Sequence, residues 1–534
     1  MKQSFADTPK DKKLRSDMLL DNWRLQYFWN FFSTKRYIIV SLILLTLMIS
    51  HSFYGNWVAD FWEHSAVVKE FSTNPLNPRH PMLKVDKPHP FFSPYLLFVG
   101  LFARFSSLSP VDALAIAGVF NLVLLLISLR LFINCLFYKN QDAIGFYSLI
   151  FILFLWPVKA WYWSGFIHFN VIGHVLPYPS TFSIATTFLI LYLYYNALNS
   201  MYKAKLLVSG ILTSLVILTH PTTGIFTLIG LFSITLQLFK NSGVKAIMSG
   251  IFLLIVVIFL VFLWPYYSFW ELTKSSDAEF HRLSYCMYKK FFISSWPIIL
   301  LSPFALDLFF SRQKNNKCDA LMLMFCFATT IYLIGYFTGL YGVGRIISFI
   351  VIIIQIALGA QLAILESEVK LDKCYDTIPI IIVIVGLIAF NNNLNVLKRT
   401  FNGFKGLRYC YTNYIFLERY VEQYDVILSD LNTSWMIPTF GGKVIASLHP
   451  AHWIDDHMER RYKLNRFFSE ELTLVEKMAI INLYGVSFIL INKDKVKNVK
   501  SYFILGNFVY ENKSFILINC FHSEHKIDDH AKKN

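Results

Sequence analysis

The sequence predicts a mostly α-helical membrane protein, in which a bundle of about eleven transmembrane helices precedes an α/β domain outside the membrane. Composition is the first observation behind this prediction. Of the 534 residues, 55% are hydrophobic and only 16% are charged, and Phe alone accounts for 51. The second is the recurrence of apolar runs of roughly 18–22 residues, which is the length that crosses a hydrocarbon core of about 30 Å. These runs begin at Tyr37 and stop near Phe390.

Three regions follow from this pattern. Residues 1–36 form a basic leader that lacks the apolar core of a cleavable signal, so we expect it to remain in the cytoplasm. Residues 37–390 form the transmembrane part, which contains a first external loop at 54–110. Residues 391–534 have the composition of soluble sequence and form the appended domain.

Basic residues in the short loops favour one orientation. Counted from a cytoplasmic N-terminus, the turns on the cytoplasmic side carry Lys139, Lys203, Lys240, Arg312 and Lys370. The first external loop and the tail then lie on the opposite side, and we expect a bacterial inner membrane with the tail in the periplasm. The formal charge of +15 is scattered over loops and tail, so it does not indicate nucleic-acid binding.

The elements can be placed in order along the chain. The first external loop is predicted to hold helices near 60–71 and 93–106, the second lying in the membrane interface because it is short. Spans three and four flank an aromatic external loop at 161–178, and spans five and six meet at His220-Pro221. Spans nine and ten are joined by a Gly-rich turn before Arg345. In the tail, short apolar runs predict five strands, and two longer segments predict helices. The strands fall at 426–429, 443–446, 486–491, 508–510 and 514–519, and the helices at 455–468 and 470–483.

The first external loop carries the candidate catalytic residues. Asp60, Glu63 and His64 stand at i, i+3 and i+4, so they would share one face of a helix. Ionisable side chains packed against a bilayer are costly unless they have a task. The alternative is structural, because Asp60 and Glu63 also resemble the capping-box start of a helix, with Asp60 accepting backbone N–H bonds.

Basic and imidazole side chains on the external side are candidates for binding substrate or lipid phosphate. Arg345 and Lys159 could hold a phosphate, or could anchor the protein at the lipid headgroups. Four histidines could bind sugar or phosphate, or could be ordinary interfacial residues: His89, His168, His174 and His220. The sequence shows no spacing of metal ligands.

Taken together, the chain resembles the C superfamily of membrane glycosyltransferases (GT-C). The resemblance lies in the cytoplasmic leader, the acidic first external loop with two helices, the many spans and the extracytoplasmic α/β tail. Short segments add to it, namely the Pro-aromatic run at 89–95, Ser429-Asp430, Ile437-Pro438, Gly441-Gly442-Lys443-Val444 and the run at 484–490.

This resemblance implies an inverting transfer of a sugar from a polyprenyl-phosphate donor to a glycan, lipid or protein acceptor on the external face. It also implies that a carboxylate of the first external loop is the base or binds the acceptor, which here is Asp60, with Glu63 as the competitor. Many members carry adjacent acidic residues or Asp-x-Asp at this place. This chain has Asp60-Phe61-Trp62-Glu63 instead, which leaves open both the identity of the base and the participation of a divalent metal.

Two other classes of function stay open at this stage. A transporter or flippase of lipid-linked or anionic material would need ionisable residues deep in the spans, whose middles here are nearly free of charge. A non-catalytic envelope assembly protein would use the tail, with Asp60 serving only as a helix cap.

Overall fold

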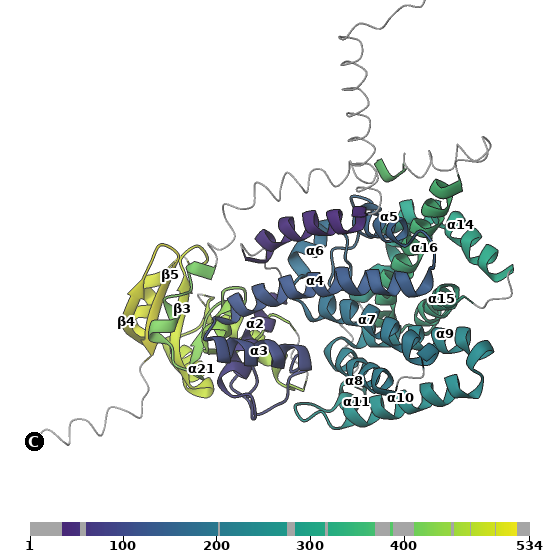
Figure 1. Ribbon diagram of the computed structural model, residues 1–534. Coiled ribbons are helices and arrows are strands. Elements are labelled where there is room, and N and C mark those ends of the chain that lie inside the picture. The colour runs from purple at the N-terminus through teal and green to yellow at the C-terminus, as the bar shows by residue number, and fades with distance from the viewer. Residues whose placement is uncertain are drawn as a thin grey trace, which may run out of the picture.

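The structure is a computed structural model, and it describes residues 35–53, 60–200, 203–274, 283–314, 319–368, 385–387, 411–449, 453–469, 471–496 and 498–520. A helical bundle forms most of it, and a small β-sheet lies beside α2 and α3 at one end of the bundle (Figure 1). Most of the predicted leader and most of the predicted eleventh span, near 375–390, lie outside the described residues.

Ten of the predicted spans are helical in the described residues. Within the described residues, eight helices are long and apolar enough to cross a membrane, and the first of them is Lys35–Phe53. The other seven correspond to α4 (Pro110–Leu136), α7 (Pro179–Ser200), α9 (Pro221–Ser242), α10 (Val244–Phe262), α14 (Phe291–Lys314), α15 (Ala320–Thr338) and α16 (Ile347–Glu368). Two predicted spans are shorter, since α5 (Gln141–Phe154) has 14 residues and α8 (Lys203–Thr219) has 17. The predicted total of about eleven spans is therefore not confirmed.

Several of these helices begin where the sequence supplies an N-cap followed by proline. Ser109 Oγ accepts the N–H of Asp112 at 3.1 Å, and Pro110 is the first residue of α4. Proline suits this position because the first helical N–H groups have no intrahelical acceptor. His220 caps α9 in the same way, with Pro221 next in the chain. Short elements connect the helices on the side of the first external loop: α6 (Phe169–Val175), α11 (Phe269–Lys274), α13 (Cys286–Lys289) and the 3-10 turn η1 (Tyr341–Ile346).

The first external loop contains the two predicted helices, α2 (Phe61–Thr73) and α3 (Pro94–Ser106). Ser93 caps α3, again before a proline. The two helices pack closely because Gly100 of α3 has no side chain: a Cβ there would lie 2.4 Å from Phe71 Cβ of α2. This close packing makes α2 part of a buried layer, so its side chains are held in fixed positions.

The C-terminal domain is α/β, as predicted. Its five-stranded sheet has the order β2-β1-β3-β5-β4, in which β1 is parallel to β2 and β3 and the remaining pairs are antiparallel. The strands are β1 (Val426–Leu428), β2 (Lys443–Val444), β3 (Val486–Asn492), β4 (Gly506–Glu511) and β5 (Phe515–Cys520). Two helices accompany the sheet, α20 (His457–Phe467) and α21 (Leu474–Tyr484), with the short elements α19 (Leu417–Tyr420), η3 (Thr433–Phe440) and η4 (Val499–Leu505). A full capping box between Thr473 and Glu476 starts α21.

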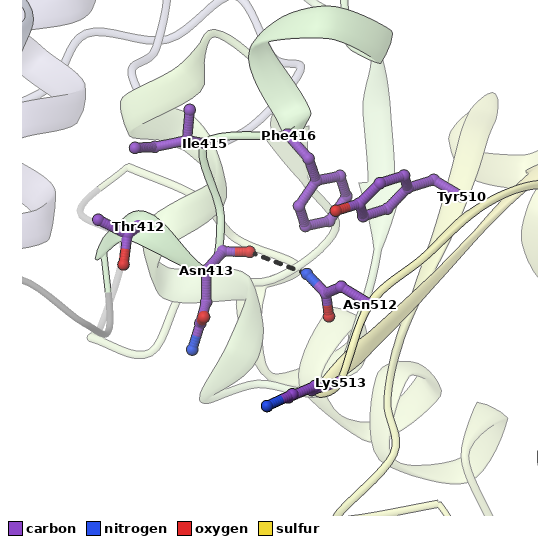
Figure 2. Close-up of a pocket in the computed structure, with 7 residues that line it drawn as sticks. All are labelled: Thr412, Asn413, Ile415, Phe416, Tyr510, Asn512 and Lys513. Atoms are coloured by element: carbon purple, nitrogen blue, oxygen red, sulfur yellow. Dashed lines mark hydrogen bonds between the residues drawn. The ribbon is translucent and has the colours of Figure 1, made fainter.

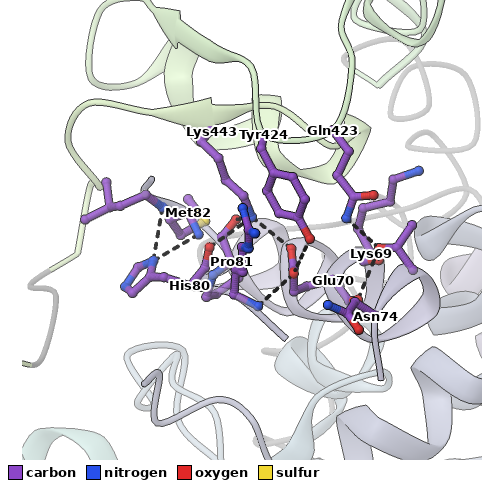
Figure 3. Close-up of polar contacts among 12 residues, drawn as sticks. Lys69, Glu70, Asn74, His80, Pro81, Met82, Gln423, Tyr424 and Lys443 are labelled. Atoms are coloured by element: carbon purple, nitrogen blue, oxygen red, sulfur yellow. Dashed lines mark hydrogen bonds and ion pairs between the residues drawn. The ribbon is translucent and has the colours of Figure 1, made fainter. Parts of the chain in front are cut away.

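The sheet is joined directly to the first external loop. Leu83 forms a parallel β-bridge with Val444, and the Val444 N–H donates to the Met82 carbonyl oxygen at 2.8 Å. Beside this bridge, Lys443 Nζ lies 2.9 Å from Glu70 Oε2, and both side chains are buried (Figure 3). The C-terminal domain is thus docked on α2 by a backbone bridge and a buried ion pair.

Candidate active site

A cavity of about 520 Å³ lies where α2, the aromatic external loop, the turn before α16 and the C-terminal domain meet. Its walls include aromatic side chains, among them Phe91, Tyr162, Trp163 and Tyr178. The ionisable side chains that line it are Asp60, Glu63, His64, His89, His174, His220, Arg345 and His449. The fold therefore brings most of the predicted site residues to one place.

One wall of the cavity is acidic. His449 Nδ1 lies 2.9 Å from Glu63 Oε1 and 3.4 Å from Asp60 Oδ1. Glu63 is buried, whereas Asp60 keeps 37% of its side-chain surface exposed. Burial raises the pKa of Glu63, and His449 opposes this shift. Although burial disfavours the charged form of His449, its contacts with Glu63 and Asp60 raise its pKa to about 8.

The structure does not support the capping alternative for Asp60. Asp60 stands at the N-cap of α2 with helical backbone angles, and its side chain makes no capping hydrogen bond. A capping carboxylate accepts a backbone N–H from the first turn while its own residue is extended. The Asp60 side chain lies near His449 instead, so its carboxylate borders the cavity.

His64 is a neutral, packed member of the site. Its ring lies 4.9 Å from that of Phe91 and 5.0 Å from that of Tyr178, measured between centroids. Burial lowers its pKa to about 4, so the imidazole is uncharged at neutral pH. A neutral imidazole can donate one hydrogen bond and accept another, but it adds no positive charge to the acidic wall.

A second wall carries positive charge. Arg345 is the only Lys or Arg among the described residues that line the cavity, and its guanidinium carbon lies 4.9 Å from the centre of the Trp163 ring. It comes from η1, where Gly344 allows close packing because a Cβ there would lie 2.6 Å from Tyr288 Cε2. The cavity thus has carboxylates on one wall and a planar cation on another.

The remaining predicted residues separate into two groups. His89, His174 and His220 line the cavity, and His220 Nδ1 lies 2.7 Å from Thr223 Oγ1. His168 is buried with its Nε2 2.9 Å from the Trp161 carbonyl oxygen, and it is not among the lining residues. Lys159 is exposed and borders a separate shallow groove with Phe292 and Trp296.

Sequence reasoning missed His449, which completes the acidic wall from the C-terminal domain. No local pattern marks it, because its contacts with Asp60 and Glu63 depend on how the domain docks on α2. Among the described residues, no three or more His, Cys, Asp or Glu side chains are grouped as a metal site needs. The residues described here therefore define no metal-ligand set.

Another hollow lies on the C-terminal domain, between residues 412–416 and the β4–β5 hairpin. Figure 2 shows the Phe416 and Tyr510 rings facing each other, with centroids 4.3 Å apart, and Asn512 pointing toward Asn413. The Asn512 side-chain N–H donates to the Asn413 carbonyl oxygen at 3.4 Å. Its described lining includes no carboxylate and no histidine.

Comparison with known proteins supports the fold. No protein-family model and no curated protein matches this sequence. Among solved structures, the chain is similar to the oligosaccharyltransferase of Archaeoglobus fulgidus tethered with an acceptor peptide. That match has a TM-score of 0.51 and 13% identity, over 92% of this chain and 75% of the other. The chain is also similar to ArnT from Cupriavidus metallidurans bound to undecaprenyl phosphate, with a TM-score of 0.50 and 10% identity, over 92% and 99% of the two chains.

The protein therefore shares its fold with these two solved structures, and this agrees with the helical bundle and the C-terminal α/β domain that the sequence predicted. The eight long apolar helices among the described residues indicate an integral membrane protein.

Proposed function

We propose that this protein is a membrane glycosyltransferase that moves a sugar from a polyprenyl-phosphate donor to an acceptor on the external face of a membrane. One observation carries the proposal: within a GT-C fold, carboxylates and an arginine line the same cavity. A glycosyl transfer from a lipid phosphate needs these two kinds of group, one for the acceptor proton and one for the departing phosphate.

In the proposed reaction, an acceptor hydroxyl oxygen attacks the anomeric carbon of the donor sugar. Its proton passes to the Asp60 carboxylate, and the bond between the anomeric carbon and the phosphate oxygen breaks. The phosphate keeps the electron pair, and the Arg345 guanidinium stabilises the charge that develops there through paired hydrogen bonds. A single displacement of this kind inverts the anomeric configuration. The acceptor can be a glycan, a lipid or a protein.

The two carboxylates have different environments, and this difference supports Asp60 as the base. Asp60 is partly exposed, so an acceptor hydroxyl can reach it, whereas Glu63 is buried and lies 2.9 Å from His449. Glu63 then serves to hold the imidazole. His89, His174 and His220 add further hydrogen-bonding groups for sugar or phosphate along the same cavity.

The proposed cellular setting follows from the loop charges. A cytoplasmic leader and an extracytoplasmic tail would put the cavity on the external side, most simply at a bacterial inner membrane with the domain in the periplasm. The ranges of the three predicted regions, 1–36, 37–390 and 391–534, are retained in this proposal.

The experiment compares purified wild type with Asp60→Asn, Glu63→Gln and a control, Glu459→Gln, on a panel of undecaprenyl-phosphate sugars. Glu459 is an exposed carboxylate on α20 outside the cavity. We expect Asp60→Asn to fold normally and to lose transfer by roughly 10²-fold or more, which is the scale of a lost general base. Full activity of Asp60→Asn with an inactive Glu63→Gln would move the role of base to Glu63. Movement of the lipid without a glycosylated product would favour a transporter.

A further inference from the structure

His449 links the C-terminal domain to the acidic wall of the cavity. Its Nδ1 is within 3.4 Å of Asp60 Oδ1 and 2.9 Å of Glu63 Oε1, so one nitrogen lies near both carboxylates. The Trp435 ring from η3 covers it edge to face, with centroids 5.1 Å apart. An imidazole held between two carboxylates fixes the separation of their oxygens.

The backbone before His449 is tied to α20. Arg461 Nε donates to the Ser447 carbonyl oxygen at 3.1 Å, and its terminal nitrogen also donates to the Leu448 carbonyl oxygen. Ser447 Oγ donates to the carbonyl oxygen of His449 itself at 2.7 Å. These bonds hold residues 447–449 against a helix of the same domain.

The domain in turn is held against α2. Lys443 Nζ donates to Glu70 Oε2 at 2.9 Å and to the carbonyl oxygens of His80 and Pro81 at 2.9 and 3.1 Å (Figure 3). Tyr424 Oη donates to the other oxygen of Glu70 at 3.1 Å. Because Glu63 and Glu70 both belong to α2, this contact and the His449 contact fix the same helix at two places.

We infer that His449 is a positioning residue, contributed by the C-terminal domain, that holds the Asp60 and Glu63 carboxylates in their working arrangement. The inference rests on the proposed function and adds a role for the tail: the site is complete only when the domain is docked. Without this cation, the neutral form of the buried Glu63 would be favoured, the contact that links Asp60 to Glu63 through His449 would be lost, and the Asp60 oxygen would move relative to the acceptor.

The surroundings of His449 favour its protonated form. Asp60 and Glu63 face it from the first external loop, and His64 of α2, which is neutral, lies nearby. Burial is the main factor that lowers the pKa of His449, and Arg461 of α20 lowers it a little more, but the contacts with Glu63 and Asp60 together outweigh both. The imidazolium is therefore expected below pH 8 and is lost as the pH rises through about 8.

The test compares wild type with His449→Gln and with His457→Gln, a control at the start of α20 outside the cavity. Glutamine keeps a hydrogen-bond donor but carries no charge. We expect His449→Gln to lower the turnover of undecaprenyl-phosphate sugars by between about 10- and 100-fold at pH 6.5, with unchanged binding of undecaprenyl phosphate. Wild-type turnover should fall as the pH passes 8, and the variant should lack that step. Equal turnover and equal pH profiles in wild type and His449→Gln would overturn the inference.

A measurement without substrate separates this inference from the proposed function. The His449 pKa is raised in the folded protein, so its contribution to stability is complete below about pH 6.5 and disappears as the pH rises through about 8. The melting temperature of wild type should therefore exceed that of His449→Gln at pH 6, and the gap should close by pH 9. A gap that is absent at pH 6 contradicts the inference. If no donor sugar is transferred but this difference in melting temperature is present, only the proposed function is contradicted.

Discussion

Replacing Lys443 with methionine should loosen the contact between the C-terminal domain and α2. The Lys443 ammonium and the Glu70 carboxylate are 3% and 2% exposed, and they lie 2.9 Å apart. Methionine fills a similar volume but donates no hydrogen bond, so it leaves Glu70 charged and buried without its cation. The carbonyl oxygens of His80 and Pro81 lose a donor at the same time.

The size of the effect follows from this burial. Removing one partner of a buried ion pair costs about 3–5 kcal/mol, because the remaining charge stays desolvated without its counter-ion. The cost weakens docking of the domain, which must open before the amide of Val444 can exchange, since that N–H donates to Met82 in the external loop. At about 1.4 kcal/mol per factor of ten, the protection of this amide should fall by roughly 10² to several thousand-fold.

Hydrogen–deuterium exchange of the full-length protein in detergent, read by mass spectrometry on a peptide that contains Val444, measures this protection. Lys463→Met is the matched control, because Lys463 pairs with Glu459 on the exposed face of α20, where such a pair contributes about 0–1 kcal/mol. The control should exchange at Val444 like wild type. Equal protection in Lys443→Met and wild type would refute the claim that this ion pair holds the domain on α2.

Two further predictions concern the lipid and the orientation. Arg345→Lys should weaken binding of undecaprenyl phosphate about 10-fold and Arg345→Ala should weaken it further, because lysine keeps the charge but loses the planar fork. The exposed Lys84→Ala is the control, and equal affinities in all of these proteins would leave Arg345 as a membrane anchor. A reporter active only in the cytoplasm should give little signal when fused after Asn534, as the loop charges imply. A strong signal would put the tail and the Asp60 loop on the cytoplasmic side.

The parts of the fold that depend on local signals could be predicted from the sequence. Ser93-Pro94 and Ser109-Pro110 mark the starts of α3 and α4, because a cap and a proline act within one turn. The tail strands β1, β3 and β5 are short apolar runs and lie where they were expected. The length of the apolar runs likewise located the eight helices that, within the described residues, are long enough to cross a membrane.

Side-chain partners in the site could be predicted less well, because they depend on contacts between distant segments. Asp60 and Glu63 have the spacing of a capping box, yet the Asp60 carboxylate lies beside His449, whose position is set by docking through β2. His168 and His174 are close in the sequence, but only His174 lines the cavity. Which way each side chain points follows from the packing of α6 and the aromatic loop, which no local pattern encodes.

The most direct test of the central claim is formation of a glycosylated product by the purified protein from undecaprenyl-phosphate sugars and candidate acceptors, followed by nuclear magnetic resonance of the new anomeric centre. We expect a product of inverted configuration from at least one donor, and loss of that product by roughly 10²-fold or more in Asp60→Asn. A product of retained configuration would contradict the single displacement. No transfer from any polyprenyl-phosphate sugar would contradict the assignment of this cavity as a glycosyltransferase site.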